Sequence, residues 1–124
     1  MSAEFTAALL VLGRLFLGAH FFIAGVRNFM NFAVWIPRME ARGVPQPKLA
    51  LIFAFAVQTA GGALVATGLR SAVGAAALIA FTIGATIAWH NFWDYAGEER
   101  RVHINYCLTN MALIGGLLLI IATA

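Results

Sequence analysis

The most unusual side chain in this sequence is an arginine inside a long apolar segment. Arg14 lies nine residues after Phe5, where the segment begins, which is about 13 Å of helix at about 1.5 Å per residue. An arginine near the middle of a bilayer costs about 2.5–3.5 kcal/mol. We therefore expect Arg14 to point inward toward a polar partner rather than to reach the membrane surface along its own apolar stem.

The partner of Arg14 cannot be a carboxylate, because no acidic residue lies inside an apolar segment. Gln58 is the polar side chain at comparable depth, and its amide carbonyl can accept from a guanidinium. That contact leaves the positive charge uncompensated. A carbonyl-rich ligand, an anion, bound water or the carbonyls of a helix end would each complete the site, and the sequence leaves these alternatives open.

Helical spacing places further polar side chains on shared faces. At about 100° per residue, four groups each share a face: Arg14, Gly18, Phe21, Gly25 and Asn28; His20, Arg27 and Asn31; Thr86, His90 and Asp94; and His103, Tyr106, Cys107 and Asn110. We expect His20, His90, Asp94 and Asn110 to gather in a polar pocket at one end of a helical bundle. We expect His103 to be solvated in a loop.

Metal and redox-centre chemistry receives little support from the sequence. His20, His90 and Asp94 lack the close spacing of a metal site, so we predict no metal. No haem, flavin or iron–sulfur motif is present. Cys107 is the single cysteine, so it cannot form a disulfide within the chain, and we expect a small buried apolar side chain.

The elements that must position these residues are membrane-spanning helices. Of the 124 residues, 62% are hydrophobic and 10% are charged, whereas about a quarter of a soluble domain is charged. Apolar stretches near 20 residues long, the length needed to cross a bilayer, occupy about 5–26, 48–68, 72–93 and 104–122. We predict an all-α integral membrane four-helix bundle, a single transmembrane domain surrounded by lipid, with Ser71 as N-cap of the third helix. The net charge of +3 is too dilute for nucleic-acid binding.

The distribution of basic residues predicts the orientation of the bundle. Loops 27–47 and 94–103, with Lys48 at the first loop's end, carry six basic side chains, and Arg70 stands alone on the opposite side. Basic loops stay in the cytoplasm. We therefore predict that both loops are cytoplasmic and that both termini are periplasmic. Trp35, Trp89 and Trp93 also lie near the loop side, where interfacial aromatic residues are typical.

Four motifs, spread in order over nearly the whole chain, resemble one family. They are Gly13-Arg14-Leu15 with Phe21-Phe22 and Gly25 to Arg27; Gly43-Val44-Pro45 with Gln58, Gly61-Gly62 and Gly68; His90-Asn91-Phe92-Trp93; and Asn110 with Gly115-Gly116-Leu117. Together they resemble the DoxX family of small four-helix membrane proteins. This family often has an acidic residue where Gln58 stands and a lysine where Thr109 stands, so the sequence favours a neutral ligand over a proton relay.

The resemblance implies a protein of the bacterial inner membrane. The family is named for a quinone-linked thiosulfate oxidoreductase of the cell membrane. Other members are membrane partners of sulfur-handling and superoxide-detoxifying enzymes. Our first hypothesis is a quinone-interacting membrane subunit in redox or sulfur metabolism. Its electrons would come from a partner protein. Four residues would hold the quinone headgroup, with aromatic stacking on the ring: Arg14, Gln58, His90 and Asn110 as polar contacts, and Phe21 with Trp89 or Trp93 as aromatic contacts.

Two other functions remain as alternatives. The chain would serve as a non-catalytic accessory subunit that anchors a larger membrane complex, since its short loops and small-residue faces suit lateral docking. A small transporter is less favoured. Four-helix multidrug exporters of similar length rely on a buried glutamate in the first helix, and this chain has Arg14 in the corresponding region. In each case a bundle of this size commonly associates with a second copy of itself.

Overall fold

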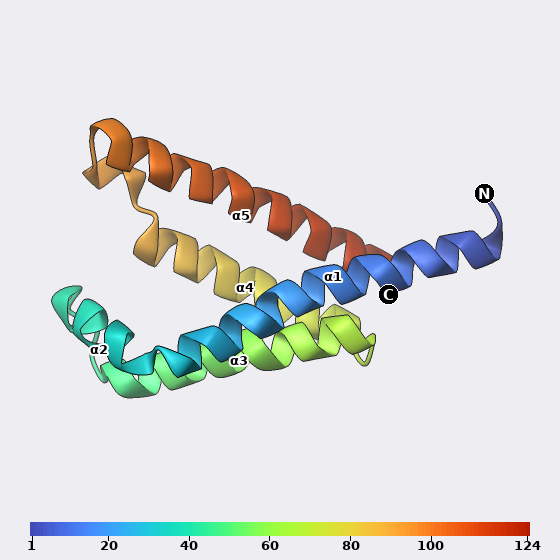
Figure 1. The fold of residues 1–124 in the computed structure, drawn as a ribbon, viewed down its shortest axis with the longest axis horizontal. Helices are drawn as coiled ribbons and strands as arrows, with labels where there is room; N and C mark the ends of the chain where they lie inside the picture. Colours follow the sequence, from blue (N-terminus) through green and yellow to red (C-terminus); the bar gives the residue numbers. More distant parts are fainter.

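The computed structural model describes residues 1–124 and consists of helices joined by short connections (Figure 1). The elements are α1 (Ala3–Met30), α2 (Phe32–Ala41), α3 (Pro47–Thr67), α4 (Ser71–Trp89), a short 3-10 helix, η1 (Phe92–Asp94), and α5 (Gly97–Thr123). By length and composition, α1, α3, α5 and the α4–η1 segment are long and apolar enough to cross a membrane. The predicted all-α fold with four spans is confirmed, and α2 is an additional helix within the predicted loop 27–47.

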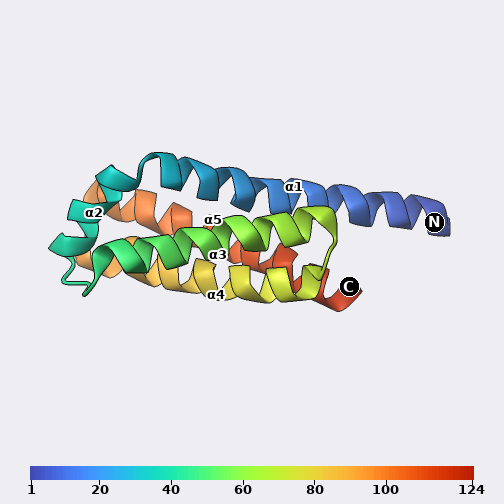
Figure 2. The ribbon, with the colours of Figure 1, turned by 90° about the horizontal axis from the view of Figure 1, so that it is seen from below.

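The long helices pack in a sequential order. The most extensive interface joins α1 to α3, followed by α3 with α4 and α4 with α5, whereas α1 and α5 touch only over a small area. Both termini lie at one end of the bundle, and α2 and η1 lie at the other, which we call the loop end (Figures 1 and 2). Toward the loop end, α5 diverges from α1 and α3.

Glycines allow α1 and α3 to approach closely. A methyl group built on Gly18 would overlap the backbone of Ala66, and one built on Gly62 would overlap the backbone of Phe22. Small residues permit this contact where lipid supplies no hydrophobic driving force between helices. The predicted face with Gly18, Phe21 and Gly25 is therefore the packing face of α1.

The hydrophobic core lies in the half of the bundle near the turn between α3 and α4. Its buried members come from all four long helices: Phe21, Val65, Ala75, Leu78, Leu117 and Ile120. The two cavities described below lie instead in the half near the loop end.

The ends of α4 differ from the sequence prediction. Arg70, in the left-handed conformation with φ 49°, occupies the N-cap position, and Ser71 is already helical and buried. The predicted Ser71 cap is wrong because the turn after Gly68 places Arg70 at the cap position and Ser71 inside the helix, whereas a capping serine precedes the first helical residue. At the other end α4 stops at Trp89. Asp94 therefore does not continue one helical face with Thr86 and His90.

Candidate functional site

Arg14 lies beside the turn between α3 and α4. A methyl group built on Gly68 would lie 3.4 Å from Arg14 Nε, so the guanidinium is level with the end of α3, where the last carbonyls lack intrahelical partners. The first turns of α1 continue beyond this turn (Figures 1 and 2). The expected contact between Arg14 and Gln58 is therefore not formed.

Gln58 instead binds Asn28. The buried Gln58 Oε1 accepts a hydrogen bond of 2.9 Å from Asn28 Nδ2. Gln58 follows Pro47 by 11 residues, about 16 Å of helix, which is about half of a 30 Å bilayer core. Gln58 therefore lies near the middle of α3, and its hydrogen bond places Asn28, with its neighbour Arg27, level with that point.

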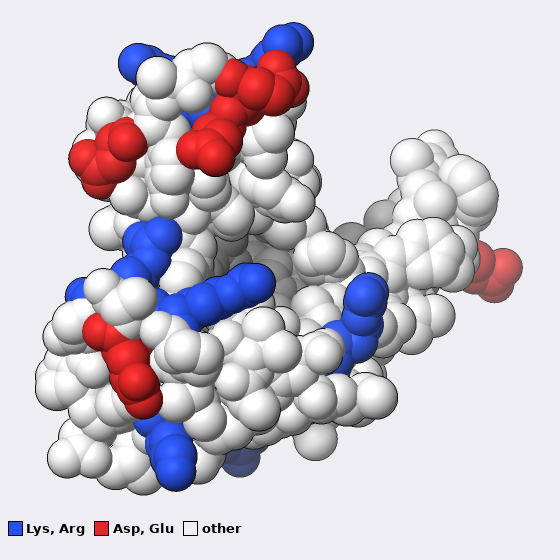
Figure 3. Space-filling model, turned by 60° about the vertical axis from the view of Figure 1, so that its left-hand side comes forward, with Lys and Arg blue, Asp and Glu red and all other residues white.

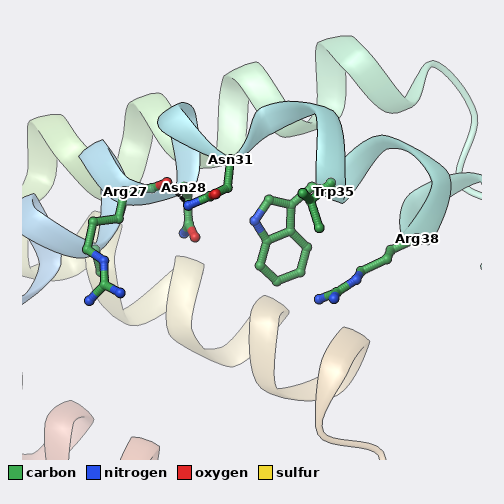
Figure 4. Close-up of a pocket in the computed structure, with 7 residues that line it drawn as sticks. Arg27, Asn28, Asn31, Trp35 and Arg38 are labelled. Atoms are coloured by element: carbon green, nitrogen blue, oxygen red, sulfur yellow. Dashed lines mark hydrogen bonds between the residues drawn. The ribbon is translucent and has the colours of Figure 1, made fainter.

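A cavity of about 340 Å³, which we call the α1–α2 pocket, opens at the junction of α1 and α2 (Figure 4). Its polar lining consists of Arg27, Asn28, Asn31, Trp35 and Arg38. The side chains of Arg27 and Trp35 extend from their helices toward α4. Two hydrogen bonds position the amides, since Asn28 Nδ2 donates to Gln58 and Asn31 Nδ2 donates to the carbonyl of Arg27 at 2.9 Å.

The α1–α2 pocket carries uncompensated positive charge. No Asp or Glu lines it, and the salt bridge of the chain, between Arg101 and Glu98, lies on α5. The guanidinium carbon of Arg38 lies 5.1 Å from the centroid of the Trp35 ring. Viewed toward the loop end, the surface is hollowed in its middle, and basic side chains border the hollow while acidic ones lie farther out (Figure 3).

At the loop end, two histidines join α4 to α5. His90 Nδ1 and His103 Nδ1 lie 3.1 Å apart, a hydrogen bond that requires one ring to donate and the other to accept. Tyr106 stacks on His90 with ring centroids 4.6 Å apart, and Tyr95 stacks on His103 at 4.4 Å. His103 is therefore half-buried within aromatic contacts, and the prediction that it is solvated in a loop is wrong.

Arg42, just after α2, binds the end of α4. Its guanidinium donates to the carbonyl of Ala88 and, at 3.3 Å, to Asn91 Oδ1. The guanidinium carbon also lies 4.5 Å from the centroid of the Trp89 ring. Ala88 is in the last turn of α4, where carbonyls need external donors, so Arg42 stabilises the end of this helix and connects it to the first loop.

A second, smaller cavity of about 210 Å³, which we call the α4–α5 groove, lies between these two helices. Its walls are mostly apolar and carry no charged side chain: Ile83, Ile87, Met111 and Ile114, with Thr86, Cys107 and Asn110. Asn110 Nδ2 donates to Thr86 Oγ1 at 2.8 Å, and Thr86 Oγ1 donates to the carbonyl of Thr82 at 2.6 Å. Asn110 keeps one N–H and its carbonyl oxygen for another partner.

The structure separates the predicted site residues into several places. His90 and Asn110 both lie along the α4–α5 contact, since Cys107, which lines the groove with Asn110, donates from Sγ to the carbonyl of His90 at 3.4 Å. Gln58 lies in the α1–α3 interface. Arg14 is at the opposite end of the bundle. These four residues therefore do not surround one common cavity.

The remaining predicted residues lie outside both cavities. Phe21 is buried in the core, so its ring is not free to stack on a ligand. His20 is exposed on α1 beside Phe21. Trp93 is exposed and contacts Phe92 edge to face, and Asp94 accepts a hydrogen bond of 2.8 Å from Asn91. The expected gathering of His20 with His90, Asp94 and Asn110 is not observed.

The lining of the α1–α2 pocket was missed by sequence reasoning. From the sequence, Arg27 is expected on a helical face with His20 and Asn31, and both Arg27 and Arg38 are expected among the loop charges, because the segment after Val26 is predicted to be a loop. The spacing of Asn31, Trp35 and Arg38, four and then three residues apart, is the helical signal that would have placed them on one face.

Comparisons with known proteins identify a matching family and a similar membrane protein. Residues 9–91 match the DoxX family. The sequence is similar to the inner membrane protein YphA of Escherichia coli (strain K12), with 27% identity over 115 residues that cover 93% of this chain and 82% of YphA. No solved structure matches the sequence.

Proposed function

Because the chain belongs to the DoxX family, we propose that it is a quinone-interacting subunit of the bacterial inner membrane and that the α4–α5 groove holds the quinone headgroup. The observation that carries this proposal is the half-satisfied amide of Asn110 in a groove without charged side chains. A quinone is neutral and soluble in lipid. It therefore suits the groove better than the charged α1–α2 pocket.

The residues of the groove fit both redox forms of such a ligand. The free N–H of Asn110 can donate to a quinone carbonyl, and its carbonyl oxygen can accept from a quinol hydroxyl. Ile83, Ile87 and Met111 are exposed on the surface of the bundle, so they offer apolar contacts to the ring and to an isoprenoid tail. When bound, a quinone supplies two-electron redox chemistry.

The setting of this site is part of the proposal. We place the chain in the inner membrane, as the name of YphA states for that relative, with the loop end in the cytoplasm and both termini in the periplasm. A partner redox protein exchanges electrons with the quinone, docking from the membrane or the cytoplasm. Association with a second copy of the chain is compatible with this arrangement.

The test measures quinone bound to the untagged protein after mild extraction, by native mass spectrometry and by solvent extraction with chromatography. We expect a quinone on the wild-type chain and at least a tenfold lower content in Asn110→Leu. Asn105→Leu is the matched control, because Asn105 is an exposed asparagine on the same helix that does not line the groove. Ile83→Trp, which fills the groove without removing a hydrogen bond, should lower the content as well.

Each outcome has a clear meaning when the variants melt at similar temperatures. Equal quinone content in wild type, Asn110→Leu and Ile83→Trp would contradict the groove as the site. A wild-type chain without quinone, held stoichiometrically in a larger complex, would contradict the whole proposal and support the accessory-subunit alternative.

A further inference from the structure

The α1–α2 pocket contains two arginines that lack acidic partners. Arg27 and Arg38 line the same cavity, and neither forms a salt bridge. Glu40, the acidic residue of α2, does not line the cavity. A guanidinium stays protonated at every physiological pH, so this cavity carries fixed positive charge.

Arg27 lies in the last turn of α1, beside the loop end. The Asn28–Gln58 hydrogen bond holds this part of α1 against α3. Ionisable residues of membrane-spanning helices face cavities and mark sites of binding or transport. An anion in the pocket would compensate the charge of Arg27 more fully than water does.

The shape and polar lining of the pocket favour an anion with several oxygen atoms. Arginine presents paired N–H donors that match the oxygens of phosphate or carboxylate. The amides of Asn28 and Asn31, which are held by their own hydrogen bonds, each keep a second N–H for a further oxygen. A cavity of about 340 Å³ leaves room for a phosphate group and a small substituent.

The surroundings of the pocket give an anion access from two phases. The surface of the loop end is hollowed (Figure 3), and in the proposed orientation this end faces the cytoplasm. Because α1 and α5 touch only over a small area, near Leu17 and Gly116, a lipid can also approach laterally at the loop end. Anionic lipids are abundant in the cytoplasmic leaflet, where basic side chains attract them. The Trp35 indole, against Arg38, is a typical interfacial side chain.

We propose that the α1–α2 pocket, through its arginines Arg27 and Arg38, binds an anion that contains a phosphate group, carried by an anionic phospholipid headgroup or by free inorganic phosphate. This site is separate from the α4–α5 groove. Its failure and the failure of the quinone proposal are therefore distinguishable.

The experiment compares three probes on the delipidated full-length chain: phosphatidylglycerol, phosphatidylcholine and inorganic phosphate. Native mass spectrometry reports bound lipid, and titration calorimetry reports inorganic phosphate. We expect Arg27→Gln/Arg38→Gln to weaken binding of the phosphate-bearing anion at least tenfold. Arg70→Gln/Arg100→Gln removes the same charge outside the pocket and should leave binding unchanged.

A second variant keeps the test independent of folding. Asn28→Asp is nearly isosteric, Gln58 can turn its amide to donate to the new carboxylate, and the added negative charge pairs with Arg27 and repels an anion. Preference for phosphatidylglycerol over phosphatidylcholine, lost in Asn28→Asp, would assign the site to a lipid. Binding of inorganic phosphate with the same variant pattern would assign it to the free ion. The proposal would be overturned if the wild-type chain bound neither phosphatidylglycerol nor inorganic phosphate, or if the variants bound them as well as the wild-type chain does.

Discussion

Arg42 illustrates how a single side chain stabilises the loop end. Its guanidinium donates to Ala88 and Asn91 and stacks on Trp89. It therefore joins the segment after α2 to the C-terminal end of α4, two parts of the chain more than 40 residues apart. Few backbone contacts link them otherwise, because the helices diverge in this half of the bundle (Figure 1).

Replacing Arg42 should destabilise the protein without affecting distant sites. In Arg42→Met the carbonyl of Ala88 loses its donor, at a cost of about 1 kcal/mol, which corresponds to a melting temperature lower by about 4 °C. Arg100→Met is the control, since Arg100 is exposed and its guanidinium has only a long contact, 5.8 Å, to Phe92. Identical melting curves for both variants in the same detergent would show that the Arg42 contacts contribute nothing.

At the residue scale, sequence patterns predicted shared faces but not depth. The face of His103, Tyr106, Cys107 and Asn110 does lie against the end of α4, since Asn110 contacts Thr86 and the other three contact His90, the residue that follows the helix. Arg14 lies level with Gly68 rather than with Gln58, because α1 extends past the α3–α4 turn. Depth depends on how far one helix is shifted along another, and that shift is set by contacts such as Gly18 with Ala66, which periodicity alone does not reveal.

At the scale of elements, the close contact of α1 and α3 supports the whole bundle. It includes Gly18, Gly25 and Gly62, each of which faces the backbone or a side chain of the opposite helix at a distance that excludes a methyl group. The same interface carries the Asn28–Gln58 hydrogen bond. It therefore fixes the shift between the two helices and with it the position of the α1–α2 pocket.

Two alanine substitutions on α1 should have opposite effects. Gly18→Ala forces α1 and α3 apart and should destabilise the protein by about 1–3 kcal/mol. Gly13→Ala, one and a half turns earlier, meets no heavy atom within 4 Å and should stabilise the helix by up to about 1 kcal/mol, because alanine is the better helix former. Thermal melting of both variants in one detergent measures the difference, and a Gly18→Ala protein as stable as Gly13→Ala would contradict the packing described here.

The elements were predictable to the extent that apolar length defines them. Four long apolar stretches were sufficient to predict α1, α3, α4 and α5. The helix α2 was missed because it has ten residues and contains Pro37, features that favour a loop. The predicted third span, 72–93, agrees with the candidate span Ser71–Asp94, in which α4 ends at Trp89 and η1 completes the segment.

At the scale of the whole molecule, the bundle has one tightly packed end and one open end. The core lies near the α3–α4 turn, and both cavities lie toward the loop end. The residues that line the two cavities come from several helices. They are grouped by the way the helices diverge toward the loop end rather than by any single sequence motif. Sequence reasoning predicted a polar pocket at the loop side, yet it could not determine which residues line it.

The orientation of the molecule can be tested with reporter fusions. Six basic residues near the loop end against two at the other end, Arg14 and Arg70, predict cytoplasmic loops. A C-terminal alkaline phosphatase fusion should therefore be active, and a C-terminal green fluorescent protein fusion should be dark. Fusions after Pro45 should give the reverse pattern. A bright C-terminal fluorescent fusion would contradict the orientation.

The unequal lengths of the helices have a consequence for the surrounding bilayer. The 28 residues of α1 measure about 42 Å, whereas the 19 residues of α4 measure about 28 Å. An apolar segment longer than the hydrocarbon layer must tilt or thicken the membrane locally. We therefore expect lipids with longer acyl chains to accumulate beside the first turns of α1 and shorter ones to accumulate beside α4.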